Sequence, residues 1–171
     1  MHMKGQRYQG DNIMENRIFA YCNVDAKSSE DLFKLFFNDL NENNYVEDSW
    51  LEAITKREQN YPTGLRLPGI CVAIPHAEAV NVKKSTLAVA TLKNPVVFMA
   101  MDEPEEAVNV NIVISLIVSD PKQQIPLLQS VVDAIQDESF LKQLLDARKE
   151  EDIVCLVNER LSLKENLWVV Y

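Results

Sequence analysis

The residue best suited to chemistry in this sequence is His76, which directly follows the apolar run Ile70–Ile74 and Pro75. The chain has two histidines, and His2 lies in its first three residues, so imidazole chemistry from a folded site must use His76. Proline donates no ladder hydrogen bond, so the chain should leave the sheet there and expose His76 at a strand end. With a reference pKa near 6.5, about three quarters of such an imidazole is neutral and nucleophilic at pH 7. Taken alone, the pattern still favours a surface or capping histidine without chemistry.

A second group of residues, a short distance upstream, could bind an anion. Arg57 is expected at the end of a helix, and its planar guanidinium could grip phosphoryl oxygens. Pro62-Thr63-Gly64 predicts a turn, where the Thr63 hydroxyl and backbone N–H groups, including that of Gly64, could donate to the same anion. Each residue by itself also fits a structural role, as a solvated arginine at a helix C-terminus or as ordinary turn chemistry. Their closeness to His76 in the sequence favours one anion-handling site.

Other kinds of site have less support. The sequence contains no P-loop and no GxGxxG, so it shows no local nucleotide-binding motif. Cys22, Cys71 and Cys155 are far apart among apolar residues, which predicts buried free thiols and a reducing compartment. Without a CxxC pair or a second histidine in the body of the chain, we expect no metal and no cofactor. Residue types leave Ser–His–Asp or Cys–His catalysis open through Ser115 or Cys71, but no nucleophile-elbow pattern supports it.

Composition and charge limit the class of protein. The chain has 171 residues, of which 47% are hydrophobic and 25% charged, as expected for a single globular domain. The formal net charge of −9 argues against nucleic-acid binding, which needs clustered lysine and arginine. A small phosphorylated partner remains compatible, because local charge sets the potential of a site. There is no signal-peptide pattern and no apolar run of the roughly 18 residues that a membrane helix needs, so we expect a cytoplasmic protein.

The first half of the chain alternates between strand and helix patterns. The expected elements are a strand over residues 17–24, a helix over 32–40 capped by Ser28 or Ser29, a helix from residue 48 or 49 to 61, and a strand over 70–74. The second helix must end by Tyr61, because Pro62 disfavours helical geometry in the residue before it. Residues 65–68 are expected to form a short connector.

The second half predicts more of both elements. The expected elements are strands over 87–92 and 96–99 joined by a turn at residues 93–95, a strand over 108–118, and helices with apolar stripes over 125–135, 140–145 and 153–161. The strand over 108–118 should begin near an edge and end buried in a sheet covered on both faces. Residues 167–171 could pair as a strand. We expect residues 1–15 to be a disordered or cloning-derived N-terminus and residues 16–171 to form one α/β domain, with helices on both sides of a central sheet.

Several of these residues together resemble a known family. Arg57-Glu58, Pro62-Thr63-Gly64-Leu65, Gly69 and Val72-Ala73-Ile74-Pro75-His76 resemble the enzyme IIA domains of the bacterial sugar phosphotransferase system, in the fructose/mannitol branch that includes galactitol-type proteins. The resemblance extends from about Asn16 to Leu163 and implies a mixed β-sheet flanked by helices.

The resemblance also implies an activity, that of a phosphotransferase with a phosphohistidine intermediate. In that family the histidine at the place of His76 accepts a phosphoryl group from the carrier HPr. It then passes the group to a cysteine of an enzyme IIB domain, and the arginine matching Arg57 is expected near the phosphoryl group. The sugar is handled by the membrane component, enzyme IIC, so contact with a membrane is expected only indirectly.

One position departs from the mannitol and fructose pattern. Those members carry a second histidine at the start of the helix after the long buried strand, where this chain has Gln124. The departure resembles the galactitol-type branch. Gln124 could donate one neutral hydrogen bond to the phosphoryl group or orient the ring. Leu65 and Leu67 are expected in the apolar surface that both protein partners contact, whereas Ile70 is expected in the core.

Two other functions remain open at this point. The domain could be a regulator whose phosphorylation state is sensed by another protein, without sugar transport. It could also be a binding module that has lost phosphotransfer, although the presence of His76 and Arg57 counts against this.

Overall fold

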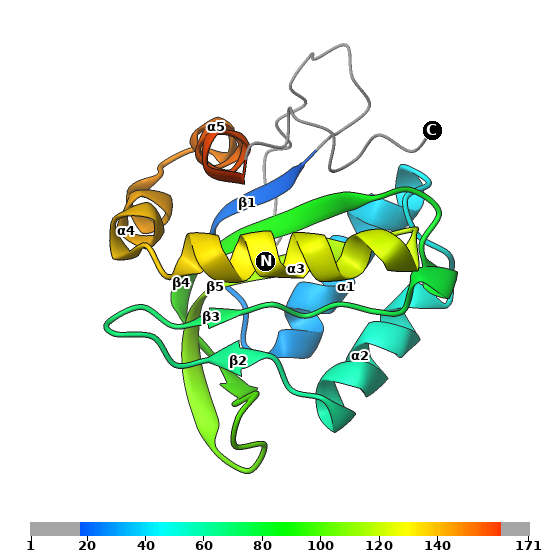
Figure 1. The fold of residues 1–171 in the computed structure, drawn as a ribbon, viewed down its shortest axis with the longest axis horizontal. Helices are drawn as coiled ribbons and strands as arrows, with labels where there is room; N and C mark the ends of the chain where they lie inside the picture. The colour runs from blue at the N-terminus through cyan, green and yellow to red at the C-terminus, as the bar shows by residue number, and fades with distance from the viewer. Residues whose placement is uncertain (1–17, 162–171) are drawn as a thin grey trace.

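A mixed β-sheet of five strands forms the centre of the molecule (Figure 1). The structure is a computed structural model, and it describes residues 18–161. The strands are β1 (Phe19–Val24), β2 (Gly64–Leu65), β3 (Val72–Ala73), β4 (Thr86–Met99) and β5 (Ala107–Ile117), in the order β1-β4-β5-β3-β2. β4 is antiparallel to β5 and parallel to β1, while β3 is parallel to β5 and antiparallel to β2. The predicted α/β fold with a central mixed sheet is confirmed.

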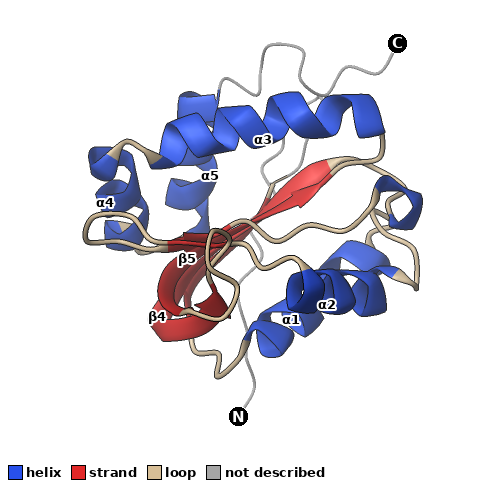
Figure 2. Ribbon diagram, turned by 60° about the horizontal axis from the view of Figure 1, so that its bottom comes forward, coloured by secondary structure: helices blue, strands red, loops and turns tan. Residues whose placement is uncertain are grey.

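Helices cover both faces of this sheet, as predicted (Figure 2). They are α1 (Ser29–Glu42), α2 (Trp50–Asn60), the 3-10 turn η1 (Ala79–Asn81), α3 (Pro121–Ile135), α4 (Glu138–Asp146) and α5 (Glu150–Leu161). α1 and α2 lie on one face, and α3, α4 and α5 lie on the other. In the part of the chain that the structure describes, no helix is long and apolar enough to cross a membrane.

The two layers of helices bury two separate apolar cores, and β5 contributes to both. Val113 and Ile117 belong to the core under α1 and α2, whereas Ile112, Ile114 and Leu116 belong to the core under α3, α4 and α5. This alternation follows from the two-residue period of a strand. It also explains why the predicted strand over 108–118 becomes continuously apolar, because both of its faces are covered there.

Local sequence signals set where the helices begin and end. Ser28 is the residue that caps α1, and its hydroxyl accepts a hydrogen bond from the Asp31 N–H at 3.2 Å. α2 ends at Asn60, two residues before Pro62, as the sequence predicts. Asp120 caps α3 by accepting from the Lys122 N–H, with Pro121 in the first helical position. The chain therefore enters α3 within three residues of the end of β5.

The predicted turn at residues 93–95 is wrong. β4 continues through this segment as one strand, with an irregularity between Thr91 and Val96. Over this stretch the partner positions on β5 move only from Ile112 to Val110, so residues 93–95 bulge out of the ladder and are exposed. A bulge tolerates proline, which donates no ladder hydrogen bond, so long-range pairing overrides the local Asn-Pro signal.

The region before His76 differs from the prediction in length. The strand expected over 70–74 is regular only at Val72–Ala73, and the strand expected over 17–24 begins at Phe19. Gly64–Leu65, expected as part of a turn and a connector, instead forms an edge strand that pairs with β3. The expectations for residues 1–15 and 167–171 lie outside the described residues.

Gly64 lies where the edge strand passes closest to β4. A Cβ atom at this position would lie 2.6 Å from the Met99 carbonyl oxygen and 3.3 Å from the Phe98 Cβ. The Gly64 carbonyl also accepts a hydrogen bond from the Met101 N–H at 2.8 Å. Glycine is therefore required for this close backbone approach, which holds β2 against the sheet.

The substitution Gly64→Ala should destabilise the protein. Since the obstruction is backbone, it cannot turn away, and we expect a loss of about 1–3 kcal/mol of unfolding free energy, measured by urea denaturation. Gly69→Ala is the control, because a Cβ there meets nothing closer than 3.8 Å and tests only the cost of its positive φ of 85°. A Gly64→Ala protein as stable as the wild type would contradict the close approach.

Candidate functional site

His76 lies at the carboxyl edge of the sheet, directly after β3. Because β3 and β5 are parallel, their carboxyl ends meet at one edge, and His76 forms an isolated bridge with Leu116 there. α3 begins at the same edge, since it follows β5 after three residues. In open α/β sheets, ligands bind at the carboxyl ends of the strands. The structure therefore places His76 at the strand end that the sequence predicts, while its role in a site stays a prediction.

The backbone before His76 is fixed from both sides. The Pro75 carbonyl accepts hydrogen bonds from the Leu116 N–H at 3.2 Å and from the buried Ser115 hydroxyl at 2.9 Å. On the other side, the Ile74 N–H donates to the Thr63 carbonyl at 3.3 Å. Ser115 thus has a structural partner, and the histidine stands on a rigid support although β3 is short.

A single hydrogen bond selects the tautomer of the His76 ring. Nδ1 lies 3.0 Å from the Ile74 carbonyl oxygen. A carbonyl can only accept, so Nδ1 carries the proton and Nε2 carries the free lone pair. Burial of the half-buried ring lowers the pKa of His76, and the positive charge of Arg57 acts in the same direction, while the Ile74 bond opposes both. At neutral pH the ring is therefore mostly uncharged, and Nε2 has the free lone pair that a nucleophile needs.

Arg57 lies close enough to His76 for its charge to act on the ring. It stands in the last turn of α2, and its Nη1 is 4.0 Å from Oε1 of the exposed Glu78. Its guanidinium carbon lies 5.4 Å from the centre of the Tyr61 ring. Its Nε is buried and, within residues 18–161, has no hydrogen-bond partner. The guanidinium is therefore held in place yet retains donor capacity for an anion.

A hollow of about 240 Å³ opens beside this guanidinium. Its lining comes from α2, η1 and the residues next to them, namely Ala53, Lys56, Arg57, Asn60, Tyr61, Glu78 and Asn81. Lys56 and Arg57 are cationic, and Glu78 is anionic. The hollow thus brings Arg57 and the segment that follows His76 to one concave surface, but His76 itself is not among the residues that line it.

Thr63 and Gly64 are engaged in structural contacts. The Thr63 N–H donates to Glu58 Oε1 at 2.8 Å, and its hydroxyl donates to Oε1 and Oε2 of the same carboxylate at 3.1 and 2.9 Å. Gly64 is packed against the backbone of β4. Their predicted role in binding a phosphoryl group stays a prediction, and these contacts do not favour it for the Thr63 hydroxyl.

Gln124 lies in the first turns of α3, half-buried, at the sheet edge where His76 stands. Its neighbour Gln123, which the sequence did not single out, has a buried Oε1 atom without a hydrogen-bond partner among the described residues. Whether Gln124 contacts a phosphoryl group stays a prediction.

The apolar side chains most exposed near the site are not Leu65 and Leu67, which the sequence placed in the partner-binding surface. Leu65 and Leu67 are half-buried and pack against the core that contains Ile70, and Ile70 is buried as predicted. Their role in partner binding stays a prediction. Large exposed apolar side chains instead occur at Tyr61 (66% exposed), Val80 (80%) and Ile125 (65%). Sequence reasoning missed them; Ile125, for example, falls within the apolar stripe expected over 125–135, which predicts burial.

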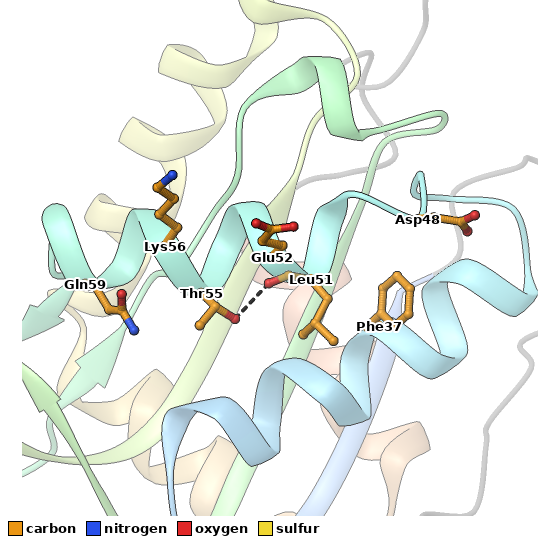
Figure 3. A pocket seen from close by; sticks show the side chains of 7 residues that line it. All are labelled: Phe37, Asp48, Leu51, Glu52, Thr55, Lys56 and Gln59. Carbon is orange, nitrogen blue, oxygen red and sulfur yellow. Dashed lines mark hydrogen bonds between the residues drawn. The ribbon is translucent and has the colours of Figure 1, made fainter.

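A second hollow, of about 620 Å³, lies between α1 and α2 (Figure 3). It is lined by Phe37, Asp48, Leu51, Glu52, Thr55, Lys56 and Gln59. None of these is a histidine, a cysteine or a serine, so this lining offers no nucleophile comparable to His76. Within residues 18–161, no cluster of three or more histidine, cysteine or carboxylate side chains is arranged to hold a metal ion.

The protonation of His76 can be measured directly. In ¹⁵N NMR spectra of the histidine rings, His76 should show the Nδ1–H tautomer and titrate below the ordinary value of 6.5. Arg57→Gln should raise the midpoint, because it removes a positive charge, but leave it below 6.5, because burial is the larger cause. A wild-type midpoint at or above 6.5 would contradict this description of the site.

Comparison with known proteins agrees with this geometry. The family model described as "Phosphoenolpyruvate-dependent sugar phosphotransferase system, EIIA 2" matches residues 12–160. The galactitol-specific EIIA component of Escherichia coli K12 is 36% identical over 100 residues, which span 58% of this chain and 66% of that protein, just under two thirds of its length.

Solved structures share the fold. The crystal structure of the mannitol IIA protein of E. coli superposes with a TM-score of 0.64 at 22% identity, covering 82% of this chain and 94% of that one. A complex of the E. coli mannitol enzyme IIA with phosphorylated enzyme IIB gives a TM-score of 0.64 at 21% identity, covering 88% and 97%. With a matching family model over most of its length, the chain belongs to the type-2 enzyme IIA family of the phosphoenolpyruvate-dependent sugar phosphotransferase system.

Proposed function

We propose that the protein is a cytoplasmic phosphohistidine carrier, which accepts a phosphoryl group from phosphorylated HPr on His76 and passes it to a cysteine of an enzyme IIB component. The observation that carries this proposal is a neutral imidazole whose Nδ1–H is held by the Ile74 carbonyl, with the Arg57 charge beside it. Membership of the enzyme IIA family supports the same role.

The first transfer is an in-line displacement at phosphorus. The Nε2 lone pair of His76 forms the new N–P bond, and the bond to the donor histidine breaks, so that its nitrogen leaves with the electron pair. The Nδ1 proton stays on the ring, where the Ile74 carbonyl stabilises the positive charge that develops. No proton has to move at His76, so positioning and charge stabilisation are the main requirements.

Arg57 stabilises the phosphoryl oxygens in this mechanism. Its contact with Glu78 spans 4.0 Å between partly and largely exposed side chains, so leaving that carboxylate costs little. The planar N–H donors of Arg57 fit the oxygens of a phosphoryl group better than they fit the distant Glu78 carboxylate. Gln124 could add a neutral hydrogen bond in the place where mannitol-type relatives have a histidine.

The second transfer reverses the first at the same atom. A cysteine thiolate of enzyme IIB attacks phosphorus, the N–P bond breaks, and Nε2 recovers its electron pair. Both partners must therefore reach Nε2 over the same surface. Tyr61, Val80 and Ile125 are exposed on segments that border the site and suit a transient interface.

For the substrate of the pathway, we propose galactitol or a related polyol. The galactitol-specific EIIA component is 36% identical to this chain over 100 residues. In addition, this chain has Gln124 where the mannitol pattern has a histidine. The sugar itself would be bound by enzyme IIC, not by this chain. The sugar can therefore be inferred from which enzyme IIB domain accepts the phosphoryl group.

A labelling experiment tests the proposal. Radiolabelled phosphoenolpyruvate, enzyme I and HPr should place one phosphoryl group on the wild-type protein and none on His76→Ala, because the nucleophile is gone. His2→Ala is the matched control, since it removes the other histidine of the chain and should label fully. Labelling of His76→Ala at the wild-type level would disprove the assignment.

The labelled protein can then be mixed with purified enzyme IIB domains. We expect rapid loss of label to a galactitol-type domain and at least 10-fold slower loss to a mannitol-type domain. Retention of the label with every IIB domain tried would instead favour a regulator that is read by another protein.

A further inference from the structure

Glu58 is an acidic residue in an unfavourable place, and the proposed transfer chemistry does not use it. It stands in the last turn of α2, where the helix dipole disfavours negative charge. Burial raises its pKa to about 7, although the hydrogen bonds from Thr63 and the charge of Arg57 oppose this shift. Carboxylates with a pKa raised in this way are frequent at functional sites.

Both oxygens of this carboxylate bind one residue across the turn at Pro62. Oε1 accepts from the Thr63 N–H at 2.8 Å, and the Thr63 hydroxyl lies 3.1 Å from Oε1 and 2.9 Å from Oε2. Thr63 itself is buried, with 3% of its surface exposed. The carboxylate therefore fastens the end of α2 to the start of β2 at a point inside the molecule.

From Thr63 the connection continues to the imidazole. The Thr63 carbonyl accepts from the Ile74 N–H at 3.3 Å, and the Ile74 carbonyl accepts from the His76 Nδ1–H at 3.0 Å. Glu58 is thus linked to His76 through two residues, each bonded to the next. At the other end it is the chain neighbour of Arg57. The bonds between Glu58 and Thr63 restrain the backbone at the end of α2, and Arg57 projects from that same backbone about 100° around the helix.

We propose that Glu58 is a positioning residue for phosphoryl transfer: by binding Thr63 with both oxygens, it sets the placement of the Arg57 guanidinium relative to the His76 ring. The expected effect on the transfer rate rests on the proposed function. The effect of Glu58 on the position of Arg57 does not. A displacement of about 1 Å in a reacting arrangement can cost as much as 100-fold in rate.

The test compares Glu58→Ala and Glu58→Gln with Glu52→Ala, which removes the same charge from an exposed position of α2. In single-turnover labelling by phosphorylated HPr, Glu58→Ala should lower the maximal rate at least 10-fold. The HPr concentration for half-maximal rate should stay unchanged, because the exposed docking side chains are intact. Glu58→Gln, which keeps one oxygen acceptor, should recover much of the loss, and Glu52→Ala should label like the wild type.

A second readout needs no transfer at all. If Arg57 loses its placement in Glu58→Ala, its lowering effect on the His76 pKa is lost, and the NMR midpoint of His76 should rise. Mere loss of the Glu58 carboxyl group cannot raise that midpoint. With a pKa of about 7, Glu58 is mostly protonated where His76 titrates, and loss of its remaining negative charge would lower the midpoint. The sign of the change therefore separates positioning from simple electrostatics. It would also remain informative if the wild type were not labelled by phosphorylated HPr, a result that would disprove only the proposed function.

Stability must be measured alongside, by urea denaturation. A folded Glu58→Ala protein with the wild-type maximal rate, or with a His76 midpoint that is unchanged or lower, would overturn the proposal. If Glu58→Ala does not fold, Thr63→Val serves in its place, because it removes the hydroxyl contacts and keeps the N–H contact. It should show the same two changes at smaller size, and their absence would overturn the proposal equally.

Discussion

The hydrogen bond from His76 Nδ1–H to the Ile74 carbonyl is the interaction on which the site depends. It places the proton on one ring nitrogen and leaves the other as the nucleophile. It also requires the chain to turn back on itself within two residues, which is possible because Pro75 ends the strand between them. The neighbouring β5 holds this turn through Leu116 and the hydroxyl of Ser115, so the architecture of the sheet determines the chemistry of one nitrogen atom.

The helices complete the site from two faces. α2 belongs to the layer below the sheet and supplies Arg57, while α3 belongs to the layer above and brings Gln124 to the same edge. α2 is anchored through Trp50 in one core, and α3 through Leu127 in the other. Phosphoryl transfer needs fixed charges more than proton traffic, so under the proposed function an arginine and a neutral ring can suffice without a second histidine.

The sequence was sufficient to predict the position of His76 and of Arg57. Pro75 and Pro62 are local signals with a steric cause, and they act in the same way in any tertiary setting. The bulge at residues 93–95 was mispredicted because cross-strand pairing, which is not visible in a local pattern, overrode a turn signal. The engagement of Thr63 by Glu58 and the exposure of Tyr61, Val80 and Ile125 also depend on contacts between distant segments. Periodicity finds the elements, but it does not say which polar atoms are already paired.

If the Ile74 carbonyl holds the Nδ1 proton, Nε2 of His76 should carry the phosphoryl group. NMR of ¹⁵N-histidine-labelled protein, phosphorylated through HPr, identifies the modified nitrogen by its coupling to ³¹P. We expect a single phosphorylated nitrogen, Nε2 of His76, with the proton retained on Nδ1. Attachment at Nδ1, or at any other residue, would contradict it.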